Sequence, residues 1–132
     1  MQDYADAAER HFLSADAIHT EHPATASHCY GIAAECVLKA LMSNLQPQVH
    51  RVSGKHIGIS LWSEFANHQT LQTHPSRIAG AIKYQSGFNG WDIGQRYLSR
   101  MSAEFAEAKV SAQSQSARGL LGLLQLVQRG LA

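Results

Sequence analysis

The sequence predicts an all-α fold, an antiparallel up-and-down bundle of four to five helices. Apolar residues recur at helical spacing through the long segments of the chain, and no segment shows the apolar and polar alternation of a strand. Apolar residues make up 45% and charged residues 16% of the 132 residues, which is enough material for one core. No internal repeat divides the chain, so we expect residues 1–132 to form a single domain.

The first predicted helix covers residues 3–19. One of its faces is mostly apolar, with Tyr4, Ala8, His11, Phe12, Ala15 and Ile18 at helical spacing. Residues 20–23 break this pattern, and a second helix is expected to begin at Pro23 or Ala24, because proline suits the first turn of a helix.

The second predicted helix ends near Asn44 and is apolar around most of its circumference, which predicts a central place in the bundle. A narrow polar stripe remains, formed by His28, Glu35 and Lys39. Steps of seven and eleven residues nearly complete two and three helical turns, so these side chains share one face. Small residues at Ser27, Gly31 and Ala34 would let a neighbouring helix approach closely.

The remaining helices are predicted with less regular patterns. A loop covers residues 43–54, a third helix residues 56–72 and a shorter segment residues 76–84. A fourth helix is expected from Trp91 through Met101, and a long last helix over residues 102–129, with a kink or fray in its serine-rich stretch. The aromatic residues expected in the core of this part of the chain are Trp62, Trp91 and Tyr97.

Charge is unevenly distributed along the chain, although the net charge is only +1. Residues 1–35 carry a net charge of −5 and residues 36–132 a net charge of +6. This asymmetry indicates either a basic face for an acidic partner such as RNA, or acidic side chains of the first helix pairing with nearby bases. The longest apolar stretch, residues 119–127, is too short to span a membrane, and no signal peptide is recognisable, so we expect a cytoplasmic location.

Cysteine and histidine placement gives no indication of a disulfide, metal or cofactor. Cys29 and Cys36 lie seven residues apart on one predicted helix, about 10 Å along its axis, whereas a disulfide needs Cα atoms within about 7 Å. Eight histidines are present, but none forms a motif with cysteines or carboxylates that is typical of a metal site. Glycine-rich nucleotide-binding loops are absent.

Two segments resemble the HEPN family of helical bundles. The second helix reads SHCYGIAAECVLKALM and is followed after a loop by KHIGISLW, similar to the family's AAExxLKALL helix, loop, and histidine that opens the next helix. The residues that match are Ala33, Ala34, Glu35, Leu38, Lys39, Ala40, Leu41, His56 and Leu61. The segment FNGWDIGQRY is similar to a sub-group of that family, with Trp91, Gln95, Arg96 and Tyr97 as its marks.

This resemblance implies a bundle that usually forms homodimers and belongs to a toxin–antitoxin, phage-defence or RNA-processing system. Active HEPN members are metal-independent ribonucleases in which an arginine is followed a few residues later by a histidine. In the dimer, the histidine takes part in acid–base chemistry at a ribose 2′-hydroxyl and the arginine steadies the phosphate. Other members lack this pair and serve as binding modules.

Arg51 and His56 are the candidate catalytic residues, because they stand in the order and spacing of the family's pair. A histidine can exchange protons at neutral pH, and an arginine can bind phosphate through two parallel hydrogen bonds. The pair departs from the family pattern, however, since it lies in the loop before the third predicted helix rather than on a later helix. Arg96 lies on a later helix, but no histidine follows it.

The candidate binding residues are the polar stripe of the second helix and three residues near the fourth: His28, Glu35, Lys39, Arg96, Tyr97 and Arg100. The Glu35–Lys39 spacing is typical of a surface ion pair worth about 0.3–0.5 kcal/mol, or of a polar face turned to a ligand or a second subunit. Arg96 and Arg100 would share a helical face and repel, unless Asp92 or a bound phosphate offsets them.

Three functions remain open from the sequence. The first is a HEPN-like module, non-catalytic or weakly active and dimeric, that binds RNA or a partner protein. The second is a metal-independent ribonuclease that uses Arg51 and His56, or Arg96 with a histidine from the second subunit. The third is a helical protein-interaction module with no role in nucleic-acid binding.

Overall fold

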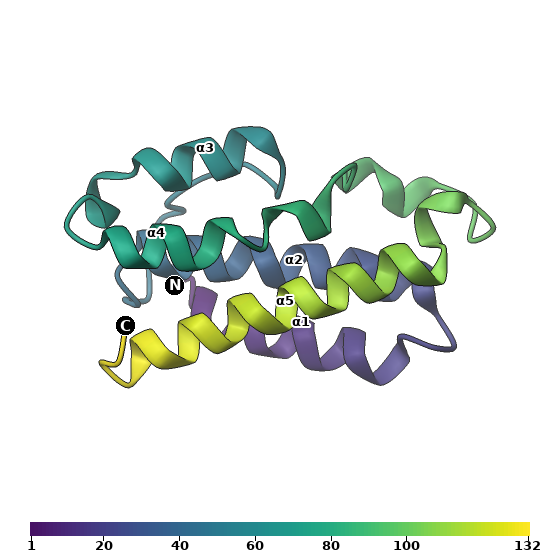
Figure 1. Ribbon diagram of the computed structural model, residues 1–132, viewed down its shortest axis with the longest axis horizontal. Helices are drawn as coiled ribbons and strands as arrows, with labels where there is room; N and C mark the ends of the chain where they lie inside the picture. The colour runs from purple at the N-terminus through teal and green to yellow at the C-terminus, as the bar shows by residue number, and fades with distance from the viewer.

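The computed structural model describes all 132 residues and contains helices and turns but no strand element. Figure 1 shows the helices packed lengthwise as a bundle, which confirms the all-α prediction. The α-helices are α1 Tyr4–Ile18, α2 Pro23–Met42, α3 Ile59–Asn67, α4 Pro75–Ile82 and α5 Glu107–Gln128. Short 3-10 helices lie between them: η1 Gln69–Leu71, η2 Gln85–Phe88, η3 Ile93–Tyr97 and η4 Ala103–Phe105. No helix is long and apolar enough to cross a membrane.

Helix α2 occupies the centre of the bundle, as its apolar circumference predicted. Fourteen of its 20 residues are buried. Helix α1 runs against it in the opposite direction, while α5 lies beside it in the same direction (Figure 1). The remaining side is covered by α3 and by the 3-10 turns η1, η3 and η4, while α4 packs on α3 and α5. Any polar side chain of α2 that still reaches solvent must therefore do so through gaps between these covering elements.

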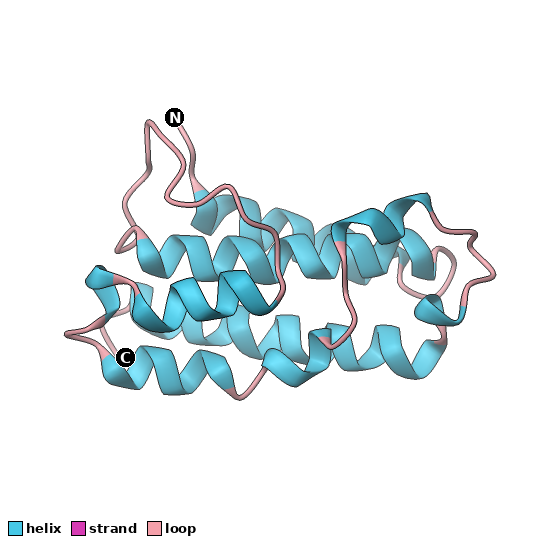
Figure 2. Cartoon of the chain, turned by 90° about the horizontal axis from the view of Figure 1, so that it is seen from above, coloured by secondary structure: helices cyan, strands magenta, loops and turns pink.

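The chain between α2 and α3 makes a long irregular excursion. Helix α2 ends at Met42, and Asn44 and Leu45 then take left-handed backbone conformations with φ of 52° and 65°. The loop passes close to the N-terminus, where Gln2 and Gln48 exchange backbone hydrogen bonds. Figure 2 shows this loop and the N-terminal residues side by side at one end of the molecule. Helix α3 starts at Ile59 instead of His56, so His56 belongs to the loop.

The predicted fourth helix is reduced to one short 3-10 turn, η3. Its first turn is fixed by a capping box between Asp92 and Gln95, but Leu98 leaves it in an extended conformation. Trp62 and Trp91 are buried as predicted, whereas Tyr97 is 78% exposed. The prediction of Tyr97 as a core residue is therefore wrong, because the helix that would have turned it inward ends at this residue.

Helix α5 runs without interruption through its serine-rich stretch, so the predicted kink or fray is wrong. Two polar side chains of this stretch, Gln113 and Ser116, are buried, whereas Gln115 and Arg118 are exposed. Gln113 accepts a 2.7 Å hydrogen bond from Ser27 of α2, and Ser116 packs against Gly87. The two buried residues are polar because they meet polar or small partners inside the bundle.

Candidate functional site

Glu35 and Lys39 form a buried ion pair at the C-terminal half of α2. Their side chains are 9% and 6% exposed, and Lys39 Nζ lies 2.9 Å from Glu35 Oε2. The interpretation as a surface ion pair is therefore wrong. Burial comes from the start of the chain, since the Tyr4 ring centroid lies 5.9 Å from Lys39 Nζ and the Tyr4 hydroxyl donates a hydrogen bond to Gln2. A pair held in this way is sheltered from salt screening.

His56 completes this cluster from the loop before α3. Its Nδ1 lies 2.9 Å from Glu35 Oε1, and a carboxylate can only accept, so Nδ1 carries the proton and donates it. One carboxylate therefore binds Lys39 through one oxygen and His56 through the other. The His56 side chain is 46% exposed. Fixing Nδ1 in this way orients the ring and leaves Nε2 as a proton acceptor.

Arg51 lies beside the cluster of Glu35, Lys39 and His56 and makes no salt bridge. A cavity of about 180 Å³, called the basic cavity below, is lined by Gln2, Tyr4, Glu35, Lys39, Arg51 and His56. The structure thus brings the predicted pair Arg51 and His56 together with two residues of the predicted polar stripe. Two cations, Lys39 and Arg51, share this cavity with the single carboxylate of Glu35 and with His56, and this excess of positive charge favours an anionic ligand.

A larger hollow begins on the other side of His56. This central cleft has a volume of about 610 Å³ and lies between residues 54–60 and residues 85–93. Its aromatic walls are Trp62, Phe88 and Trp91. Since His56 lines both hollows, its imidazole stands where the basic cavity meets the central cleft.

A second basic hollow, called the Arg96 pocket, lies at the N-terminal half of α2. It has a volume of about 430 Å³ and is lined by Ala24, Thr25, His28, Gln95, Arg96, Tyr97, Leu98 and Phe105. The Arg96 guanidinium lies 4.8 Å from the Tyr97 ring centroid. His28 stacks on Trp91 with ring centroids 6.3 Å apart. Burial, and then the nearby Arg96 charge, lower the pKa of His28 below its usual value.

The predicted stripe of α2 is therefore divided between two hollows. Glu35 and Lys39 line the basic cavity, while His28 lines the Arg96 pocket. The separation of His28 from Glu35 is seven residues, or about 10 Å along the helix axis. Even so, the charges of Glu35 and His56 act on the pKa of His28. The two hollows lie along one face of α2.

Arg100 does not join Arg96. It is exposed in the segment after η3 ends at Tyr97, so the expected shared helical face does not exist. Asp92 does not pair with Arg96 either. Its carboxylate instead accepts a hydrogen bond from the Gly94 amide at 3.3 Å and caps η3. The Arg96 guanidinium consequently has the Tyr97 ring but no carboxylate beside it.

A buried polar network that sequence reasoning missed positions the Arg96 pocket. Gln95 Nε2 donates to Ser27 Oγ at 2.7 Å, and Ser27 Oγ donates to Gln113 Oε1 at 2.7 Å. Trp91 Nε1 donates to the Ser27 carbonyl at 2.9 Å. These bonds join η3, α2 and α5. Nothing in the spacing of Ser27, Gln95 and Gln113 could have indicated them, because the partners lie 68 and 86 residues apart.

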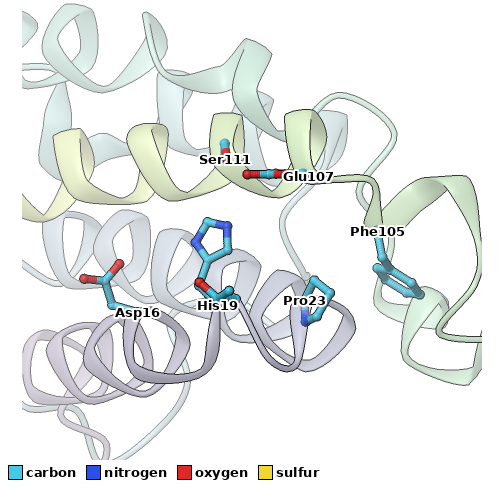
Figure 3. A pocket seen from close by; sticks show the side chains of 7 residues that line it. Asp16, His19, Pro23, Phe105, Glu107 and Ser111 are labelled. Atoms are coloured by element: carbon cyan, nitrogen blue, oxygen red, sulfur yellow. The ribbon is translucent and has the colours of Figure 1, made fainter.

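A polar pocket at the far end of α1 was also missed. It has a volume of about 430 Å³, and Figure 3 shows His19 projecting into it among Asp16, Pro23, Phe105, Glu107 and Ser111. His19 Nδ1 lies 3.0 Å from the Tyr30 hydroxyl, which donates to Asp16 Oδ1 at 3.0 Å. Arg118 lies 3.3 Å from the same carboxylate. Because these groups satisfy one another, we assign them to holding α1, α2 and α5 together.

The cysteines are free thiols, as predicted from their spacing. Burial raises the pKa of Cys29, and it raises that of Cys36 to about 12, so neither is a thiolate near neutral pH. No group of three or more histidine, cysteine, aspartate or glutamate side chains could hold a metal ion.

No protein-family model, no curated protein and no solved structure matches this chain.

Proposed function

We propose that this chain is a HEPN-like module, dimeric and cytoplasmic, that binds RNA through the basic cavity. One observation carries the proposal: Lys39, Arg51 and His56 face a single carboxylate, Glu35, in one cavity. Lys39 and Arg51 are residue types that bind phosphate, and Glu35 takes up one donor of Lys39 and none of Arg51. A phosphate group is the anion that makes best use of this arrangement.

A polymer fits the surroundings of the basic cavity better than a small free anion does. The cavity adjoins the aromatic-walled central cleft at His56, and Arg96 lies further along the same face of α2. Cations spaced along one face are typical of surfaces that bind nucleic acid.

The proposal is tested by the salt dependence of RNA binding. Fluorescence anisotropy with a labelled single-stranded RNA should give an affinity that falls linearly on a log–log plot against salt concentration. Arg51→Gln should weaken binding and reduce the slope by about 0.7, the contribution of one phosphate contact on a single strand. Lys83→Gln is the matched control, because it removes one positive charge from the end of α4, away from the basic cavity.

Binding that does not respond to salt, or equal binding by the Arg51→Gln and Lys83→Gln proteins, would contradict the proposal. Equally tight, salt-dependent binding of an acidic polypeptide would point to a protein partner instead of RNA.

A second function, metal-independent RNA cleavage, is favoured by the bond between Glu35 and His56. That bond holds Nε2 of His56 free to take the proton of a ribose 2′-hydroxyl. The 2′-oxygen would then attack the adjacent phosphorus, and the 5′-oxygen would leave with a proton from solvent or from His56 of a second copy. The products would be a 2′,3′-cyclic phosphate and a 5′-hydroxyl. Arg51 and Lys39 lie where they would stabilise the charge on the phosphate oxygens.

Cleavage is tested with the same RNA in the presence of EDTA. His56→Ala should reduce the rate by about 10²–10⁴, the usual range for loss of a general base, whereas His50→Ala should leave it unchanged. His50 is an exposed histidine in the same loop. The all-DNA oligonucleotide, which lacks the 2′-hydroxyl, should stay intact. Cleavage that persists in His56→Ala would rule out this mechanism. If the wild type binds RNA without cleaving it, only the binding function remains.

A further inference from the structure

We infer that the Arg96 pocket is a subsite for one unpaired nucleotide of single-stranded RNA, with Tyr97 as the stacking platform for its base. The inference rests on the proposed RNA binding and specifies the form of RNA recognised. Tyr97 is 78% exposed, and Arg96 lies over its ring at 4.8 Å. Aromatic rings and guanidinium planes are the groups on which proteins stack splayed bases.

The Arg96 side chain is held in place without being neutralised. It contacts the Tyr97 ring, makes no salt bridge, and its nearest acidic neighbour in sequence, Asp92, is engaged in capping η3. None of the residues that line the pocket is acidic. Its guanidinium donors are therefore available to a phosphate, and no carboxylate in the pocket competes for them.

The turn η3, which carries Tyr97, is anchored in the protein interior, although Tyr97 itself lies on the surface. Gln95, two residues earlier, is 4% exposed and bonds to Ser27 of α2. The capping box of Asp92 and Gln95 fixes the start of the same turn. The backbone that carries the ring is fixed by this buried anchor, so stacking requires little further ordering of the turn.

The floor of the pocket adds to its preference for an anion. Ala24 and Thr25 belong to the first turn of α2, which contains no acidic residue and has no side-chain cap. No side chain of that first turn offsets the partial positive charge of the helix end. A phosphate near Arg96 would also lie against this turn and beside the half-buried ring of His28.

The spacing of the two basic hollows favours one extended strand. His28 and Glu35 are separated by about 10 Å along α2, so a single strand lying on this face reaches both the Arg96 pocket and the basic cavity. A duplex keeps its bases stacked inside and cannot offer one to Tyr97. An acidic peptide could bind Arg96, but its affinity would not depend on the Tyr97 ring.

Tyr97→Ala tests the inference, with binding measured by anisotropy for a single-stranded RNA and for a duplex of the same sequence. Affinity for the single strand should fall roughly tenfold, which corresponds to about 1.4 kcal/mol. Affinity for the duplex and the salt slope should stay unchanged, because no phosphate contact is lost. Tyr97→Phe should restore most of the affinity, and Arg96→Gln should reduce the salt slope by about 0.7.

Lys83→Gln serves again as the control, since Lys83 lies 5.2 Å from the Tyr84 ring centroid and forms a similar cation–aromatic pair outside the Arg96 pocket. If Arg51→Gln weakens RNA binding and Tyr97→Ala does not, the stacking subsite is overturned while the proposed function stands. If the wild type binds no RNA, both are overturned. Equal losses of single-strand and duplex binding in Tyr97→Ala, or full competition by polyglutamate, would also overturn the subsite.

Discussion

His28 is a half-buried histidine with a lowered pKa. Burial is the main cause, followed by the charge of Arg96 and a smaller effect of His11, while Glu35 acts in the opposite direction and His56 lowers the pKa further. The Nδ1 atom of His28 is buried and has no protein hydrogen-bond partner. The pKa of His11, on α1, is lowered as well, again mainly by burial. Both rings are therefore harder to protonate in the folded chain than in the unfolded one.

This difference predicts that the folded chain loses stability in acid. Above the unfolded pKa of about 6.5 both states are neutral at these histidines, and no stability is lost. As the pH falls through 6.5 the unfolded chain binds protons first, so the free energy of unfolding decreases. Urea unfolding between pH 8 and pH 5 should show this decrease, and His28→Gln should make it shallower. His50→Ala, at an exposed position, should follow the wild-type curve; if His28→Gln follows it too, His28 is not a source of the pH dependence.

The residue scale also shows how far sequence spacing can predict a site. The four-residue spacing correctly predicted contact between Glu35 and Lys39, at 2.9 Å. It could not predict their burial, because the residues that cover them, Gln2 and Tyr4, come from the N-terminus, about 30 residues earlier in the chain. His56 lies 21 residues from Glu35 and reaches it only through the path of the loop. Local periodicity carries no information about such a path.

At the scale of elements, α2 and the segment before η3 are joined by an unusually close approach at Gly31. A Cβ atom placed on Gly31 would lie 2.1 Å from the Trp91 ring. Trp91 cannot move away freely, because its indole nitrogen is bonded to the Ser27 carbonyl. We expected a neighbouring helix to approach these small residues, but at Gly31 the close neighbour is the ring of Trp91, which lies between η2 and η3.

Gly31→Ala should lower the free energy of unfolding by about 1–3 kcal/mol, the usual effect of overpacking a filled core. Gly122→Ala on α5 is the matched control, because a Cβ there would meet nothing within 4 Å. That change should instead stabilise the helix by about 0.5–1 kcal/mol. Urea unfolding of both variants checks the prediction, which fails if Gly31→Ala is as stable as the wild type.

Element lengths were predicted well only where a repeating apolar pattern persists. Helices α1 and α2 begin and end within about two residues of their predicted bounds. The predicted fourth helix failed, since Asp92 and Gln95 use their side chains to close a short turn that ends at Tyr97. In α5 the serine-rich stretch predicted a kink or fray, but the helix is continuous there, and Gln113 accepts a hydrogen bond from Ser27 of α2. Side-chain capping and distant polar partners are decided by tertiary structure.

At the scale of the whole molecule, the bundle and its central helix could be predicted from composition and periodicity, because the apolar pattern of a helix reports which of its faces are buried. The arrangement of charge does not follow in the same way. The basic cavity and the Arg96 pocket lie along one face of α2, whereas the pocket of Asp16 and Glu107 lies between the end of α1 and the start of α5. The proposed RNA binding uses the first of these surfaces, and the Arg51→Gln and Arg96→Gln variants each remove one positive charge from it.

The backbone pairing of Gln2 with Gln48 has a practical consequence for preparing this protein. Gln2 lines the basic cavity, so a purification tag joined ahead of Met1 emerges directly beside Lys39 and Arg51. A histidine tag would add imidazoles of its own at the place where RNA binding and cleavage are to be measured. Recombinant protein for these measurements should therefore carry a removable tag that leaves no additional residues before Met1.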